Sequence, residues 1–280
     1  MQAIKRIVLL FLLGSLFSCQ SNGEKEASSS SSGATSFSEE LLSAVFEESG
    51  VNGTIVLLDA NSGQRYIHNP ERAREEFLPA STFKIPNTLI ALETGVTNET
   101  ETFTWDGTER TIEAWNRDQT LSSAFRNSVV WVYQDLARRV GEEEMQLRVD
   151  YLGYGNSDIS GGIDQFWLSG GLRISAIDQV QFLQRMIAGN LPLKPGIVQK
   201  ALPIFLEEET ETYKLYAKTG WATIPEPDLG WYVGWIETVD QRFLFALNIN
   251  IEDVSQIGNR QKLVREILRR GGLITQVQSR

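Results

Sequence analysis

The sequence predicts an α/β (α+β) fold, in which an antiparallel central sheet is flanked by terminal helices and carries a mostly helical inserted subdomain. Three observations predict it. Aromatic and β-branched runs gather towards both ends, helical periodicity fills the middle, and an amphipathic helix is expected at each end. With 280 residues, 41% of them hydrophobic, the chain can bury a large core in one or two domains.

The first elements of the folded part are a helix and a hairpin. Ser36 and Glu39 have the spacing of a capping box ahead of an apolar helical face, and Gly50 is placed to end that helix. Residues 54–59 and 64–68 then flank an Asn-Ser-Gly turn, the pattern of a β-hairpin.

The middle of the chain is predicted to be helical and the end to return to strands. Helical patterns cover residues 83–94, 129–140, 142–152 and 175–188. Strands are predicted at 214–218, 230–238 and 242–250, and an amphipathic helix at 259–270 ends before Gly271. We therefore expect the first hairpin to pair with the late strands, with the terminal helices on one face.

The net charge of the chain is −10 and its isoelectric point is about 4.8. No stretch forms a basic patch that could neutralise phosphates, so a nucleic-acid partner is not expected. The acidity is interpreted as a contribution to solubility.

The first residues have the pattern of a targeting segment. Lys5 and Arg6 precede the apolar run 7–17, which is too short to span a bilayer and is typical of a signal peptide. The run ends at Cys19 in a sequence similar to a lipoprotein cleavage site. We interpret 1–18 as a lipoprotein signal peptide, 19–35 as the lipidated cysteine and a flexible Ser-rich tether, and 36–280 as the catalytic domain.

This interpretation predicts an extracytoplasmic protein. Gln20, rather than Asp, follows Cys19 and favours a periplasmic protein anchored to the outer membrane, with the lipid on Cys19 as its only membrane contact. An ordinary secretory signal, cleaved nearby without lipidation, remains the alternative.

Residue counts exclude several hydrolytic chemistries. His68, at a predicted strand end, is the only histidine, so a Ser-His-Asp triad is not expected. Cys19 is the only cysteine, which excludes a disulfide within one copy and a cysteine-based metal site. No glycine-rich phosphate loop follows a strand. We therefore expect a reaction that uses neither histidine nor metal.

Ser81 and Lys84 are the strongest catalytic candidates. Three residues apart on a helix, they share one face, so the amine can lie beside the hydroxyl. Pro79 blocks helix before Ser81 and places the serine near a helix start, where free backbone N–H groups and the positive end of the dipole stabilise an oxyanion.

Three further triplets accompany this pair in order along the chain. Ser128-Val129-Val130 opens a predicted helix and Tyr154-Gly155-Asn156 closes another. Lys218-Thr219-Gly220 ends a predicted strand, where the lysine and threonine can hold a carboxylate and the glycine lets substrate backbone approach. Each triplet alone is a common pattern, and their order and wide spacing are not.

Together these motifs resemble the class D (oxacillinase-type) serine β-lactamases of the penicillin-recognising superfamily. The resemblance includes Gln165-Phe166-Trp167-Leu168 and Gly230-Trp231-Tyr232-Val233-Gly234-Trp235, and covers about residues 40–275. It implies a β-lactamase/transpeptidase-like fold and the hydrolysis of β-lactams, penicillins above all, with no metal or organic cofactor.

The resemblance also implies that Lys84 is carboxylated on Nζ by CO₂ and serves as the general base for acylation and deacylation. Apolar neighbours such as Phe83, Val130 and Leu168 would lower the pKa of Lys84 and supply the neutral amine that CO₂ requires. The indole N–H of Trp167 would stabilise the carbamate.

The remaining roles follow from the family. Ser81 would be the nucleophile, with its own N–H and that of Trp221 as the oxyanion hole. Ser128, helped by Lys218, would protonate the leaving nitrogen. The residues that would bind the substrate carboxylate or line the site are Thr219, Gly220, Arg260, Tyr154 and Asn156.

Two alternatives share this fold and these motifs. One is an antibiotic sensor that stays acylated, which usually hangs from several membrane helices. The other is a low-molecular-mass D,D-peptidase, against which the Trp167 segment argues. The sequence leaves the substrate range beyond penicillins and the oligomeric state open.

Overall fold

The computed structural model describes residues 35–224 and 226–274. The predicted signal peptide, Cys19 and the predicted tether, apart from its last residue, lie outside the described residues. The helices are α1 (Glu39–Ser49), α2 (Lys84–Thr94), α3 (Leu121–Arg126), α4 (Val130–Val140), α5 (Glu142–Leu152), α6 (Ala176–Ile187), α7 (Ile197–Phe205) and α8 (Asn259–Arg270).

Six strands form one antiparallel sheet in the order β2-β1-β8-β7-β6-β5. The first hairpin therefore pairs with the last strand, as predicted, through the contact of β1 with β8. The bounds of the six strands are β1 (Gly53–Asp59), β2 (Arg65–His68), β5 (Leu206–Glu209), β6 (Lys214–Ala222), β7 (Asp228–Glu237) and β8 (Arg242–Ile251); β3 (Thr102–Phe103) and β4 (Gln119–Thr120) form a separate small ribbon.

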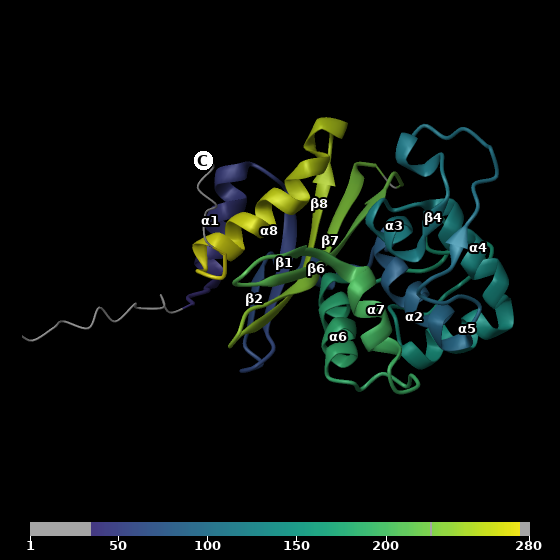
Figure 1. Cartoon of the computed structure of the whole chain (residues 1–280). Coiled ribbons are helices and arrows are strands. Elements are labelled where there is room, and N and C mark those ends of the chain that lie inside the picture. Colours follow the sequence, from purple (N-terminus) through teal and green to yellow (C-terminus); the bar gives the residue numbers. More distant parts are fainter. Residues whose placement is uncertain (1–34, 225, 275–280) are drawn as a thin grey trace, which may run out of the picture. The chain divides into compact units, whose positions relative to one another are not determined.

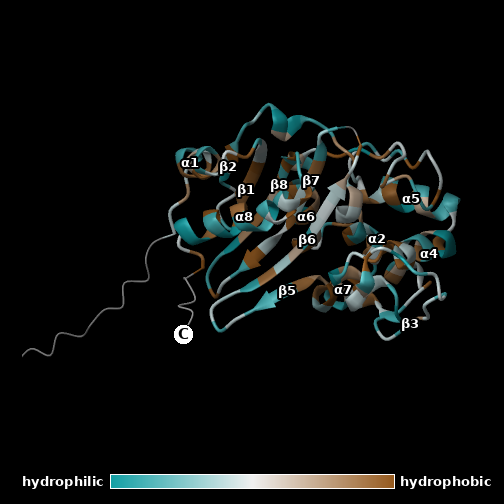
Figure 2. Ribbon diagram, turned by 90° about the horizontal axis from the view of Figure 1, so that it is seen from above, coloured by the Kyte–Doolittle hydropathy of each residue, from teal (hydrophilic) through white to brown (hydrophobic). Residues whose placement is uncertain are grey.

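Both faces of the sheet are buried because successive strand residues point to opposite sides. In β1, Ile55 and Leu57 belong to the core under α1 and α8, whereas Val56 and Leu58 belong to the core shared with the other helices. Figure 1 shows α1 and α8 side by side on one face, and α6 with the helical subdomain on the other. Hydrophobic residues follow the strands, while the outward sides of α1 and α8 are hydrophilic (Figure 2).

Three predicted boundaries are wrong. Ser38 caps α1, since its side chain accepts a hydrogen bond from the Leu41 N–H, while Ser36 donates its backbone N–H to Gly271. Ser81 lies in the 3₁₀ helix η2 (Ala80–Phe83), one turn before α2. The strand predicted to end at Lys218 continues to Ala222, because Gly220 and Trp221 pair with Trp231 and Gly230 of β7.

No helix within the two described ranges is long and apolar enough to cross a membrane.

Candidate active site

Ser81 lies in a strained turn at the entrance to α2. The preceding residue, Ala80, is buried and has a φ of 47°, a left-handed conformation that is costly for a residue with a Cβ. Its backbone N–H donates to the carbonyl of Trp167 at 3.0 Å, and Thr82 N–H donates to Pro79 O at 3.1 Å. These bonds fix the path of the chain and hold Ser81, which is half-buried, at the surface of the core.

Lys84 lies directly beneath Ser81. Its Nζ donates to Ser81 Oγ at 2.9 Å, and its side chain is fully buried. The Nζ atom lies 5.1 Å from the ring centre of Tyr133, whose hydroxyl contacts Thr88 Oγ1 at 2.9 Å. Burial, and secondarily the positive charge of Lys218, hold the pKa of Lys84 well below its ordinary value. The amine is therefore neutral at a lower pH than an exposed lysine and can accept a proton from Ser81.

A second serine–lysine pair joins two distant parts of the chain. Ser128 lies between α3 and α4, and Lys218 lies in the middle of β6. Lys218 Nζ donates to Ser128 Oγ, and also to Thr219 O at 3.0 Å and Thr219 Oγ1 at 3.3 Å. Burial, and secondarily the charge of Arg260, lower the pKa of Lys218 to about 7.

Trp167 is fully buried against the segment that carries both residues of the first pair. Its ring stacks on Phe83 at 5.4 Å, and its carbonyl receives the Ala80 N–H. Its indole Nε1, although buried, has no hydrogen-bond partner among the described residues. A buried donor without an acceptor is costly, so this atom is suited to a group that the chain itself does not supply. Val130 and Leu168, its predicted companions, are both half-buried.

The part of β6 that directly follows Lys218 forms another wall of the site. A Cβ on Gly220 would lie 3.0 Å from Pro79 O and 3.2 Å from Thr82 Cγ2, so the glycine lets β6 approach η2 closely. This close approach is to the protein's own backbone, whereas the sequence suggested an approach by substrate. Trp221, the next residue, is 39% exposed and its indole donates to Asp228 at 2.7 Å.

Arg260 reaches β6 from the first turn of α8. Its Nη1 donates to Gly220 O at 2.6 Å and its Nε donates to Ile257 O at 2.7 Å. Burial lowers its pKa to about 10, so the guanidinium stays charged at neutral pH. The structure thus brings Arg260 to the same stretch of strand as Thr219.

Comparison with known proteins gives the family. Residues 53–269 match the penicillin binding protein transpeptidase domain. The chain is 43% identical to beta-lactamase OXA-48 of Klebsiella pneumoniae over 82% of this chain and 88% of that protein. It is 42% identical to beta-lactamase OXA-10 of Pseudomonas aeruginosa over the same shares of each chain.

Solved structures agree with this assignment. The structure of FUS-1 (OXA-85), a class D beta-lactamase from Fusobacterium nucleatum subsp. polymorphum, has a TM-score of 0.82 at 38% identity and covers 85% of this chain and all of its own. The class D enzyme YbXI from Nostoc has a TM-score of 0.81 at 42% identity, with 83% and 99% covered. The chain belongs to the class D β-lactamases. It is therefore a serine hydrolase, and the predicted family and fold are confirmed.

Two residues predicted to line the site of this class D enzyme bond to the segments that carry it. Tyr154 is fully buried and its hydroxyl donates to Gln179 Oε1 at 3.1 Å. Gln179 in turn donates to Thr82 Oγ1 at 2.8 Å. This network lies under the turn that holds Ser81.

Asn156 supports the Trp167 loop. Its Nδ2 donates to Gly171 O at 3.0 Å, and its Oδ1 accepts the Arg173 N–H at 2.9 Å. The glycine between the two motif residues is required, since Gly155 has a φ of 58° and a Cβ there would lie 1.9 Å from Arg173 O.

The sequence interpretation missed Tyr133 and Gln179, which pack around the Ser81 segment. Helical spacing relates Tyr133 to Leu136 and Val140, and this apolar pattern places Tyr133 on the inner face of α4. Gln179 gives no signal in the sequence, because its partners Thr82 and Tyr154 lie far from it along the chain.

Proposed function

We propose that the chain hydrolyses β-lactam antibiotics, penicillins in particular, through an acyl-enzyme on Ser81, and so confers β-lactam resistance. The observation that carries the proposal is the 2.9 Å contact of the Ser81 hydroxyl with the buried, readily deprotonated Lys84. The named β-lactamase relatives, which match over most of their length, support the substrate class.

Acylation opens the lactam ring. Ser81 Oγ gives its proton to the base carried by Lys84 and forms a bond to the lactam carbonyl carbon. The oxyanion is stabilised by the N–H groups of Ser81 and Trp221. The bond from that carbon to the ring nitrogen breaks, the nitrogen takes the proton of Ser128 Oγ, and Lys218 restores the proton to Ser128 through the hydrogen bond between them.

We further propose that Lys84 carries a carboxyl group on Nζ, formed from CO₂. The surroundings fit such a group: burial favours the neutral amine that reacts with CO₂, and the unpartnered indole N–H of Trp167 offers a donor to an anion. When present, the carboxyl group supplies an anionic base beside Ser81. Val130 and Leu168 exclude bulk water from it.

Deacylation releases the product and regenerates Ser81. Between the two steps the base at Lys84 gives the proton from acylation to solvent, and Lys218 regains one. A water molecule then gives a proton to the base at Lys84, its oxygen bonds to the acyl carbon, and the bond from that carbon to Ser81 Oγ breaks as Oγ takes that proton back from the base. Thr219, Gly220 and Arg260 hold the substrate carboxylate during both steps, a role supported by the position of the Arg260 guanidinium beside β6.

A turnover assay tests the proposal. The purified chain is expected to hydrolyse many equivalents of a penicillin, and Ser81→Ala is expected to form no covalent adduct by intact-mass spectrometry. A single stoichiometric burst, with a stable adduct on the wild-type protein, would support a sensor instead.

The response to bicarbonate tests the carboxylation of Lys84 independently of the nucleophile Ser81. Depletion of bicarbonate at mildly acidic pH is expected to lower turnover, and its addition is expected to restore it, because CO₂ leaves a carboxylated lysine reversibly. Indifference to bicarbonate would contradict carboxylation and leave the Ser81 proposal standing.

We propose that Cys19 is lipidated and anchors the enzyme to the outer membrane in the periplasm. The sole cysteine of the chain, placed directly after an apolar run, supports this. Cys19→Ser is expected to release active enzyme from the membrane fraction, and a membrane-bound Cys19→Ser protein would contradict the anchor.

A further inference from the structure

Ser128 is held in a conformation that its own side chain disfavours. Its φ is 54°, in the left-handed region, and such a residue persists only where the surroundings fix it. The neighbouring N–H groups are bonded within the turn: Asn127 N–H to Ser123 O at 2.9 Å, Ser128 N–H to Phe125 O at 3.1 Å, and Val129 N–H to Ala124 O at 2.8 Å.

The carbonyl directly before Ser128 is bonded from outside this turn. The indole Nε1 of Trp115 donates to Asn127 O at 2.9 Å. Trp115 is itself held from the other side, since the indole of Trp131, in the first turn of α4, donates to Trp115 O at 3.0 Å. Two indole donors in series therefore connect the start of α4 to the peptide that enters Ser128.

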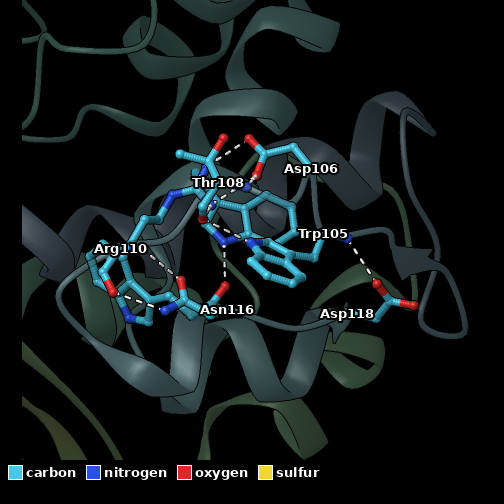
Figure 3. Close-up of polar contacts among 8 residues, drawn as sticks. Trp105, Asp106, Thr108, Arg110, Asn116 and Asp118 are labelled. Atoms are coloured by element: carbon cyan, nitrogen blue, oxygen red, sulfur yellow. Dashed lines mark hydrogen bonds and ion pairs between the residues drawn. The ribbon is translucent and has the colours of Figure 1, made fainter.

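The loop that presents Trp115 is braced by its own hydrogen bonds. Arg110 N–H donates to Asn116 Oδ1 at 2.8 Å and Asn116 Nδ2 donates back to Arg110 O at 2.9 Å, while Trp105 N–H donates to Asp118 Oδ1 at 2.8 Å (Figure 3). The Arg110 guanidinium also binds both oxygens of Asp106. A loop tied at so many points is a rigid support.

Trp131 closes the connection between this loop and α4. The Arg110 guanidinium carbon lies 5.4 Å from the centre of the Trp131 ring. The loop is thus fixed to α4, which follows Ser128, and is bonded to the Asn127 carbonyl, which precedes Ser128.

We propose that Trp115 is a positioning residue for Ser128: its indole N–H holds the Asn127 carbonyl and so keeps the Ser128 hydroxyl against Lys218. The inference rests on the proposed role of Ser128 as the proton donor to the leaving nitrogen. Without the bond, the Asn127–Ser128 peptide rotates towards ordinary φ values, and the hydroxyl leaves the line between Lys218 Nζ and the substrate.

The first test removes the N–H and keeps an aromatic ring. Trp115→Phe is expected to lower kcat/KM for a penicillin about tenfold, the loss expected for one hydrogen bond of ordinary strength. Trp105→Phe is the matched control, because the Trp105 indole N–H donates to Thr108 O within the same loop. That control is expected to change kcat/KM less than about twofold, because its bond stays within the loop and does not reach Asn127 or Ser128.

The second test asks whether the loss concerns proton donation. In a penicillin the leaving group is a basic amine nitrogen that must be protonated. In a chromogenic cephalosporin the charge on the leaving nitrogen is spread over a conjugated system. Trp115→Phe and Ser128→Ala are both expected to slow the penicillin more than the cephalosporin. The double variant is expected to be no slower than Ser128→Ala alone, since the two residues act as a unit.

Several results would overturn the inference. Equal losses on both substrates, a loss no larger than that of Trp105→Phe, or additive losses in the double variant would each do so. If Ser128→Ala leaves the substrate ratio unchanged, the proposed role of Ser128 fails with it; if only Trp115→Phe leaves it unchanged, the positioning role alone fails. Should Trp115→Phe not fold, benzothienylalanine at position 115, which replaces the N–H by sulfur at equal size, tests the same bond.

Discussion

The two serine–lysine pairs differ in how well the lysine is provided with acceptors. Lys84 has only Ser81 Oγ as a hydrogen-bond acceptor among the described residues, whereas Lys218 donates to Ser128 Oγ and to two oxygens of Thr219; each amine also lies near one aromatic ring. An ammonium has three donors to satisfy, so the surroundings of Lys218 tolerate a cation far better than those of Lys84. Both amines are buried, yet only the second is built to carry a charge.

This difference in hydrogen-bond acceptors suits the two lysines to different roles in the reaction. A buried lysine with one acceptor is held neutral and is available as a base or for reaction with CO₂. A lysine with acceptors, and with a pKa of about 7, can pass a proton to Ser128 and bind a carboxylate.

The largest effect is expected from Lys84→Met. The substitution removes the base beside Ser81 and should lower kcat by about 10³-fold or more, since general-base and nucleophile activation are lost together. It should also raise the free energy of unfolding at neutral pH, on the order of 1–4 kcal/mol, because an apolar side chain replaces a buried amine. Kinetics and urea denaturation measure the two effects.

The stabilisation has a defined pH dependence. With the pKa of Lys84 lowered in the folded protein, the unfolded chain binds more protons, so wild-type stability rises with pH up to the ordinary pKa of 10.5. In Lys84→Met the free energy of unfolding should rise less steeply with pH, because the contribution of this amine is absent. An unchanged slope would contradict a neutral buried amine.

A smaller effect is expected at the second pair. The ammonium form of Lys218 falls away above pH 7, so kcat/KM for a carboxylated substrate should decline as pH rises through that value. Lys218→Arg keeps the charge and should remove this decline, at some loss of rate through the missing bond to Ser128. If kcat/KM of the wild-type enzyme stays constant from about pH 6 to about pH 9, a range that spans the pKa of Lys218, a role for charged Lys218 would be contradicted.

The smallest effect on the chemistry should come from the support behind the first pair. Gly155→Ala forces a Cβ against Arg173 O in a left-handed conformation, and should destabilise the fold by about 2 kcal/mol or more. Residual folded enzyme should keep most of its kcat, because Asn156 and Tyr154 bond to Gly171, Arg173 and Gln179 rather than to Ser81 or Lys84. Thermal melts together with active-site titration separate the two quantities.

The local pair could be predicted from the sequence and the distant pair only through the family. Ser81 and Lys84 are three residues apart, so helical geometry alone brings them together. Ser128 and Lys218 are 90 residues apart and meet only because β6 packs against the α3–α4 turn. Nothing in the spacing of Trp115 indicates that its indole reaches Asn127.

The secondary structure shows the same division. The predicted range 142–152 is that of α5, and the late strands and α8 were found, because their periodicity is local. Helix α7 was not predicted; it contains Pro203, a residue that disfavours a helix interior. The extension of β6 to Ala222 depends on its partner β7 rather than on its own residues.

One measurement tests the contrast between the two lysines most directly. In ¹³C NMR of the enzyme supplied with ¹³C-bicarbonate, we expect a single carbamate signal that disappears in Lys84→Arg and persists in Lys218→Arg. Arginine has no primary amine that could carry the carboxyl group, so each substitution removes one of the two candidate amines. A spectrum with no carbamate signal, or with one that depends on Lys218, would contradict the assignment of the neutral role to Lys84.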